Sequence, residues 1–147
     1  MYYPPVGFHF KVEVMGISPP SDDDTRFSEV SGLSTELTAE EVVEGGENRF
    51  VQKFPIRAKF PELVLKRGLL VNSQILNWIQ KCIQELDIQP KDLVITLLNE
   101  NREPLLTWRV VNAYPTKWSV SDMNAMSNTV VIETLQLYYQ YFTLDRP

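Results

Sequence analysis

Two adjacent glycines, Gly45 and Gly46, divide the stretch from Phe27 to Pro55 into two limbs. Glycine accepts positive φ angles without steric cost, so a glycine pair between strand-like segments predicts a tight hairpin turn. The first limb has the two-residue period of a β-strand, in which Leu33, Thr35 and Leu37 alternate with Ser34, Glu36 and Thr38. The sequence therefore predicts a β-hairpin arm over about residues 33–56.

Large apolar residues flank the predicted turn. Val42 and Val43 precede the glycines, and Phe50 and Val51 follow them. Apolar side chains gathered at the end of an arm need a surface that buries them. That surface is either the chain's own core or another subunit. Four glutamates are interspersed with these residues: Glu40, Glu41, Glu44 and Glu47.

Other segments also have strand patterning. Phe8 to Met15 alternates apolar and polar residues, and Thr129 to Leu144 is rich in β-branched and aromatic residues and contains no Gly or Pro. At roughly 3.3 Å per residue the second segment would span about 50 Å, so it either bends or belongs to a large sheet. Pro55, Pro61 and Pro115 separate further candidates: Phe27–Val30, Ile56–Phe60, Glu62–Arg67, Asp92–Leu98, Leu105–Ala113 and Trp118–Ser121.

One segment has helical periodicity instead. From Ser73 to Leu86, apolar residues recur every three or four positions: Ile75, Leu76, Ile79, Cys82, Ile83 and Leu86. Asn72 or Ser73 can cap the start of this helix, and Pro90 prevents its continuation. The opposite face is polar and is expected to contact water or a partner.

The length and composition are those of one globular domain. The chain has 147 residues, of which 44% are hydrophobic and 22% are charged, enough for a real core. We expect a single domain over residues 1–147 from which the hairpin arm protrudes. About eight strands and one helix predict a mainly β fold, namely a small β-barrel or sandwich with one α-helix over about residues 73–86.

The charge distribution restricts the classes of partner. The net charge is −5, which argues against a nucleic-acid surface because such surfaces gather Lys and Arg. Acid gathers in Asp22–Asp24 and in the arm, whereas basic residues lie in the middle of the chain: Lys53, Arg57, Lys59, Lys66 and Arg67. This asymmetry either joins complementary faces of neighbouring copies or covers a solvated surface.

The sequence shows few signals for export or membrane insertion. A single cysteine, Cys82, excludes a disulfide framework within the chain and suggests a reducing cytoplasm. No apolar run approaches the roughly 20 residues of a membrane helix. The opening residues lack a basic region followed by a hydrophobic stretch, so we expect no signal peptide.

The sequence offers little for catalysis or metal binding. One histidine, His9, and one cysteine, Cys82, make a four-ligand zinc site improbable. A Cys-His nucleophile pair would use Cys82, but this residue lies on the apolar stripe of the helix, where cysteine usually acts as a small hydrophobe. The glutamates of the arm surround an exposed turn, and Gly45-Gly46 precedes a strand rather than the helix of a phosphate loop. We therefore expect no catalytic residue, metal or cofactor. Many strands, an apolar arm tip and a long terminal run instead indicate an assembly subunit.

An ordered set of segments resembles a known family. They are YYPPVGFHFKVEV at Tyr2 to Val14, FSEVSGL at Phe27 to Leu33, LKRGLL at Leu65 to Leu70 followed by SQILNWI at Ser73 to Ile79, LTWRVVNAYPTKW at Leu106 to Trp118, and IETLQLYYQYF at Ile132 to Phe142. Together they resemble inner-tube proteins of contractile injection systems, which are related to the tail-tube protein of contractile-tailed phages.

The resemblance implies hexameric rings that stack into a hollow tube. The implied partners are further copies of the chain, related tube proteins, the contractile sheath, baseplate and spike proteins, and effector cargo in the lumen. The segment Ala39–Val51 would reach a neighbouring ring, which makes the expected interface residues Glu40, Glu41, Val42, Val43, Phe50 and Val51. No active site is implied, and the protein would be made in a bacterial cytoplasm as part of a phage tail-like particle.

Alternatives remain open from the sequence. The YYPPVGFHF opening resembles the second, baseplate-proximal tube protein more than the repeating tube subunit. A monomeric small-ligand-binding β-barrel or binding module is a competing class and predicts a discrete apolar pocket. A hydrolase that uses Cys82 is a third class and predicts that Cys82→Ser abolishes an activity.

Overall fold

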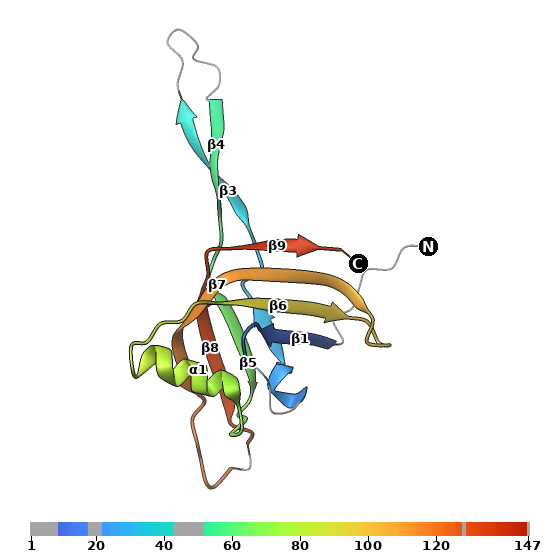
Figure 1. Ribbon diagram of the computed structural model, residues 1–147, viewed down its shortest axis with the longest axis vertical. Coiled ribbons are helices and arrows are strands. Elements are labelled where there is room, and N and C mark those ends of the chain that lie inside the picture. Colours follow the sequence, from blue (N-terminus) through green and yellow to red (C-terminus); the bar gives the residue numbers. More distant parts are fainter. Residues whose placement is uncertain (1–8, 18–21, 43–51, 128, 147) are drawn as a thin grey trace. The chain divides into compact units, whose positions relative to one another are not determined.

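The computed structural model describes residues 9–17, 22–42, 52–127 and 129–146 (Figure 1). The chain has two compact units. One, called the body here, comprises Met1–Ser31 and Glu62–Pro147, and the other, called the arm, comprises Gly32–Pro61. Within the described residues the fold is mainly β with one α-helix, which confirms the predicted class.

The body is built on a seven-stranded sheet. Neighbouring strands follow the order β1-β6-β7-β8-β5-β2, and β9 pairs with β7 in addition. In the described residues the pairings do not join β1 to β2, so the sheet is open. The elements of the body are β1 (His9–Val14), the 3₁₀ helix η1 (Asp22–Thr25), β2 (Glu29–Ser31), β5 (Leu63–Gly68), α1 (Gln74–Ile83), β6 (Lys91–Leu98), β7 (Pro104–Val120), β8 (Ile132–Tyr138) and β9 (Tyr141–Asp145).

Strand β7 connects the two halves of this sheet. Its first half pairs with β6 and β9, and its second half pairs with β8. The predicted terminal run, Thr129–Leu144, does bend, because it forms β8 and β9 on either side of Tyr139 and Gln140. Both strands run antiparallel to β7, one after the other. Pro115 does not end a strand as predicted, since β7 continues through it and the register shifts beside it.

The bend in β7 lies at Asn112, whose φ angle is +53°. Its backbone N–H donates to Asp92 Oδ1 at 3.0 Å, and its side-chain amide donates to Gln140 Oε1 at 3.0 Å. Asn is among the few side chains that tolerate the left-handed region. These bonds tie the bend of β7 to the start of β6 and to the break between β8 and β9.

Helix α1 begins where the sequence predicts and ends earlier. Ser73 caps it by accepting a hydrogen bond from the Leu76 N–H. The predicted end at Leu86 is wrong, because the helix stops at Ile83 and Leu86 has a φ angle of +54°. The buried stripe also differs from the prediction, since Trp78 is buried and Ile83 and Leu86 are exposed. The buried residues of α1 are Ile75, Trp78, Ile79 and Cys82.

The core lies on one face of the sheet, where cross-strand partners share a side. Examples are Val12 opposite Ile95 and Leu65 opposite Leu135. Helix α1 packs beside β7 on this core (Figure 1). The apolar residues with at most 1% exposure are Val12, Leu63, Leu65, Leu93, Ile95, Val110, Ala113, Leu135 and Leu137.

The arm is a two-stranded antiparallel hairpin of β3 (Glu36–Val42) and β4 (Gln52–Lys59). The segment Ile56–Phe60, predicted as a separate strand after Pro55, instead continues β4. The register shifts between Thr38 and Ala39, which lie opposite Arg57 and Pro55. This bulge accommodates a proline, which has no N–H to donate to the ladder. The predicted Gly45-Gly46 turn lies outside the described residues.

Candidate functional site

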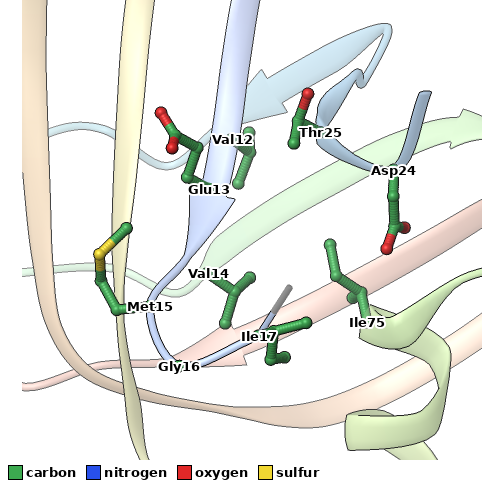
Figure 2. A pocket seen from close by; sticks show the side chains of 9 residues that line it. All are labelled: Val12, Glu13, Val14, Met15, Gly16, Ile17, Asp24, Thr25 and Ile75. Carbon is green, nitrogen blue, oxygen red and sulfur yellow. The ribbon is translucent and has the colours of Figure 1, made fainter. Parts of the chain in front are cut away.

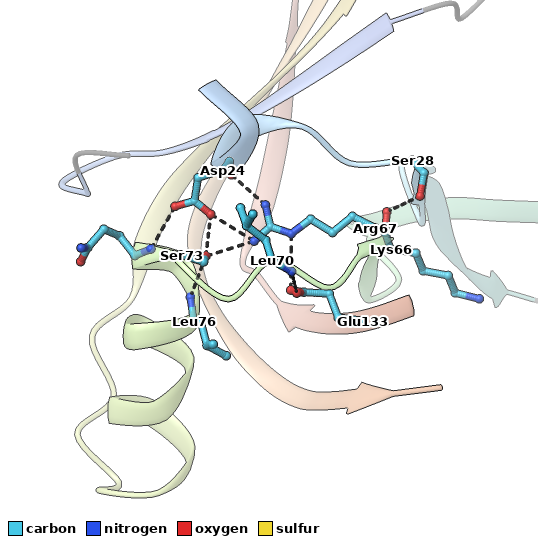
Figure 3. A network of polar contacts seen from close by, with 9 residues as sticks. Asp24, Ser28, Lys66, Arg67, Leu70, Ser73, Leu76 and Glu133 are labelled. Carbon is cyan, nitrogen blue, oxygen red and sulfur yellow. Dashed lines mark hydrogen bonds and ion pairs between the residues drawn. The ribbon is translucent and has the colours of Figure 1, made fainter. Parts of the chain in front are cut away.

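The body contains a buried ionic cluster formed by Asp24 of η1, Arg67 of β5 and Glu133 of β8 (Figure 3). Their exposed fractions are 1%, 4% and 1%. Arg67 donates to Asp24 Oδ1 at 3.1 Å and to the Asp24 backbone carbonyl at 3.0 Å. Its Nε lies 3.5 Å from Glu133 Oε1. One guanidinium therefore joins two carboxylates from distant parts of the chain.

The same cluster holds the beginning of α1. Asp24 accepts hydrogen bonds from the Ser73 hydroxyl and from the backbone N–H of Gln74, the latter at 3.0 Å. Arg67 also donates to Ser73 Oγ at 3.0 Å. A carboxylate beside the first N–H groups of a helix is favoured by the helix dipole. The cluster thus joins η1, β5, β8 and α1.

The contacts of this cluster identify it as structural. Both Asp24 carboxylate oxygens accept hydrogen bonds, and Glu133 Oε2 accepts one from the Leu70 N–H at 3.2 Å. The Arg67 guanidinium also lies over the Phe27 ring, 4.4 Å from its centroid. Buried charges that are paired and hydrogen-bonded in this way hold segments together. The reading of Asp24 and Arg67 as part of a solvated charged surface is therefore wrong.

A pattern in the sequence could have revealed the cluster. Arg67 follows Leu63 and Leu65 at the two-residue period of β5, and Glu133 precedes Leu135 and Leu137 in β8. A charged residue on the apolar face of a strand needs a partner of opposite charge. The register provides one, because Arg67 lies opposite Glu133.

A cavity of about 200 Å³ borders the cluster (Figure 2). Val12, Val14, Ile17 and Ile75 contribute apolar side chains, and Asp24 contributes its carboxylate. Sites for small molecules are usually 300–1,000 Å³. The cavity is smaller than such a site, and the Asp24 carboxylate beside it is already engaged.

A wider depression of about 430 Å³ lies beside α1. Lys81, Lys91 and the amide side chains of Gln74, Asn77 and Gln89 contribute to its lining, together with Trp78. The Trp78 indole N–H donates to the Gln89 carbonyl at 2.9 Å. This lining is polar, whereas the competing class of ligand-binding barrel predicts a discrete apolar pocket.

The two residues considered for catalysis, Cys82 and His9, do not form a site within the part of the chain that the structure describes. Cys82 is 3% exposed within α1, so its thiol is enclosed by the core. His9 begins β1, and its side chain is not among those described. Among the described residues, no group of three or more His, Cys, Asp or Glu side chains is placed to hold a metal ion.

The predicted interface residues divide between described and undescribed positions. Glu40, Glu41 and Val42 end β3, where they lie opposite Phe54, Lys53 and Gln52 of β4. Their side chains are not described. Val43, Phe50 and Val51 lie outside the described residues, so the interface remains a prediction.

The fold of this chain can be compared with those of known proteins. The described residues form a bent antiparallel sheet with one helix and a β-hairpin, and this fold matches the class of tail-tube-like proteins. Within this class, the chain belongs to the family described as T4-like virus tail tube protein gp19, whose model matches residues 6–143. No curated protein matches the chain.

Three solved structures come from contractile injection particles. A chain of the anti-feeding prophage baseplate is 32% identical with a TM-score of 0.86, and the alignment covers 99% of this chain and 98% of that one. A chain of the PVC sheath–tube complex in the extended state is 27% identical with a TM-score of 0.80, covering 99% and 93%. A chain of the anti-feeding prophage cap is 26% identical with a TM-score of 0.81, covering 100% and 94%.

These similarities establish the coarse function. The protein is a tube protein of phage tail-like contractile injection systems, and its family is one of structural proteins. The resemblance in the sequence is thereby confirmed. In the described part of the chain, no helix has the length and apolar character required to cross a membrane.

Proposed function

We propose that this chain forms hexameric rings at the start of the inner tube, next to the baseplate. The supporting observation is the similarity to a chain of the anti-feeding prophage baseplate, a structure described as six-fold symmetrised. Identity and TM-score are 32% and 0.86 for that chain, compared with 27% and 0.80 for the PVC sheath–tube chain. A tube-initiating ring would meet the baseplate on one side and the first ordinary tube ring on the other.

The expected partners follow from this position. Further copies of the chain complete the ring, and related tube proteins continue the tube. Baseplate and spike proteins lie below it, the contractile sheath surrounds it, and effector cargo passes through its lumen. The role is mechanical rather than enzymatic.

The arm supplies the contact between rings in this proposal. Glu40, Glu41, Val42, Val43, Phe50 and Val51 are its interface residues. Burial of a large apolar side chain contributes about 1.5–3 kcal/mol, less the ordering cost of the arm. Repetition around a six-fold ring makes a modest contact strong through multivalency.

Electron microscopy with mass measurement tests the assembly. The purified chain is expected to form rings or short stacks with a hexamer mass. A strict monomer at the highest soluble concentration would favour the competing monomeric binding module.

The position in the particle needs a separate experiment. A tag on this chain, labelled with gold in purified particles, is expected at the baseplate end alone. The tag fused to a sheath subunit serves as the control, since it should be labelled along the whole length. Labelling of this chain along the tube would show that it is the repeating subunit instead.

A further inference from the structure

Leu86 has a backbone conformation that is unfavourable for leucine. Its φ angle is +54°, in the left-handed region. The Asp87 N–H donates to the Lys81 carbonyl at 3.0 Å, which closes the end of α1 around Leu86. Glycine adopts this φ angle without steric cost, whereas the Cβ atom of a leucine is strained there. The Leu86 side chain is nevertheless 79% exposed, so packing within the body does not explain why a leucine is present.

Two further apolar side chains lie near Leu86 in the chain. Ile83 is 41% exposed and Ile88 is 52% exposed. We call Ile83, Leu86 and Ile88 the helix-end patch. The segment that carries them is held in place, because the Trp78 indole donates to the Gln89 carbonyl. A strained apolar residue in a fixed, exposed segment is typical of a functional contact.

A second apolar surface lies at the other end of β6. Along the core side of the sheet, exposure increases with distance from α1: Val12 and Ile95 are fully buried, whereas Phe10 and Leu97 are half-buried. The same change occurs from Val110 in β7 to Leu106. The strand register places Phe10, Leu97 and Leu106 side by side. Leu144 of β9 lies opposite Trp108, on the same side of the sheet and diagonal to Leu106, and it is 49% exposed. We call Phe10, Leu97, Leu106 and Leu144 the open-end patch.

The two patches cannot cover each other within one molecule. The helix-end patch lies just before β6 begins at Lys91. In the open-end patch, Phe10, Leu97 and Leu106 lie near the end of β6 at Leu98, and Leu144 lies level with Ile95. Eight residues of strand span about 26 Å. In Figure 1 the far ends of β1, β6 and β9 extend away from α1.

We propose that the helix-end patch of one copy packs on the open-end patch of the next copy. This inference rests on the proposed ring, for which it assigns the lateral contact between neighbouring subunits. The contact is heterologous, since each copy offers two different surfaces, and such contacts close into a ring when the rotation allows. The strain at Leu86 is then retained because its side chain is buried by the neighbour.

The first test replaces Leu86 with glycine. Leu86→Gly relieves the backbone strain, so the melting temperature of the diluted monomer is expected to rise by about 2–4 °C. The same change removes an apolar contact, so the dissociation constant between neighbours should rise about 10- to 100-fold. A simple folding defect would lower stability and assembly together, whereas this variant separates them.

The second test mixes two variants that each lose one patch. Leu86→Asp and Leu144→Asp are both expected to be monomers in analytical ultracentrifugation. Mixed together, they should form one-to-one dimers and nothing larger, because only one contact remains intact. Met126→Asp is the control, since Met126 is 95% exposed in another loop and its variant should form rings.

The outcomes separate this inference from the proposed function. If Leu86→Gly and Leu86→Asp both form rings as readily as the wild type, the inference is overturned and the proposed ring still stands. Dimers of Leu144→Asp alone would also overturn it, since they would require the helix-end patch to bind itself. A wild-type chain that forms no ring would contradict the proposed function and the inference together.

Discussion

The Arg67 guanidinium donates to Asp24 Oδ1 at 3.1 Å across 43 positions of sequence, and both side chains are at least 95% buried. Glu133 lies on the other side of the same guanidinium. One cation therefore neutralises part of the negative charge of two carboxylates that are enclosed by protein. Its removal would leave charge buried without a partner.

Arg67→Ala is expected to destabilise the body by about 3–5 kcal/mol, because it leaves Asp24 and Glu133 without their cation. Urea unfolding followed by circular dichroism measures this change. Lys66→Ala is the matched control, since its 3.9 Å pair with Glu29 is exposed and should change stability by less than about 0.5 kcal/mol. Equal effects of the two substitutions would contradict a structural role for the cluster.

Asn112→Ala is expected to destabilise the body by about 1–2 kcal/mol, because it places a Cβ-bearing residue without a helpful side chain at a φ angle of +53°. It also removes the hydrogen bond to Gln140. Asn112→Gly is the comparison, since glycine keeps the bend without strain and loses the side-chain bond alone. The free energy of unfolding should therefore decrease less for glycine than for alanine. The reverse order would show that backbone strain at the bend is unimportant.

Stability should fall at alkaline pH because of Tyr139. Burial raises the pKa of this phenol above its ordinary value of 10.0. The unfolded chain therefore releases the proton first as the pH rises, and folding loses stability from about pH 10 through the folded pKa. Below that range the group contributes no pH dependence.

Tyr139→Phe is expected to reduce the loss of stability between about pH 9 and about pH 11. Denaturant unfolding at the two pH values measures it, with Tyr138→Phe as the matched control because Tyr138 is 46% exposed. An identical loss in wild type and Tyr139→Phe would refute the assignment.

The double substitution Val43→Asp with Phe50→Asp should leave the fold intact and block stacking of rings, because it puts charge on the apolar end of the arm. Negative-stain microscopy of rings and stacks measures the effect, and circular dichroism checks the fold. Thr35→Asp with Leu37→Asp is the charge-matched control, since both side chains are exposed nearer the base of the arm. Stacks of normal length from the Val43/Phe50 variant would remove the arm from the ring contact.

Local sequence patterns predict the secondary structure well where the ends of an element depend on its own residues alone. The predicted strands Phe8–Met15, Glu62–Arg67 and Asp92–Leu98 agree with β1, β5 and β6 to within one residue at each end. The prolines were misleading, because Pro55 and Pro115 each lie inside a strand next to a register shift. A bulge that absorbs a proline depends on the partner strand, which a local pattern does not include.

The helix shows the same distinction between local and tertiary causes. Ser73 is a good cap by its chemistry, so the start of α1 could be predicted. The stop at Ile83 and the exposure of Leu86 could not, because the apolar spacing continues past the turn that ends the helix.

The ionic cluster was missed because its partners, Asp24, Arg67 and Glu133, meet through the pairing of β5 with β8 and the position of η1. The family resemblance, in contrast, depended on ordered segments along the whole chain and was confirmed.

The place of β8 between β7 and β5 has a consequence for biosynthesis. Residues 132–138 are made long after β5, and among the strands that the structure describes, β5 and its neighbour β2 pair with the rest of the sheet through β8 alone. A nascent chain can form the β6–β7 hairpin early, but β5 keeps an unpaired edge until β8 leaves the ribosome. Such edges pair readily with other chains. Copies translated side by side on one messenger are therefore most exposed to wrong pairing in the interval before β8 emerges.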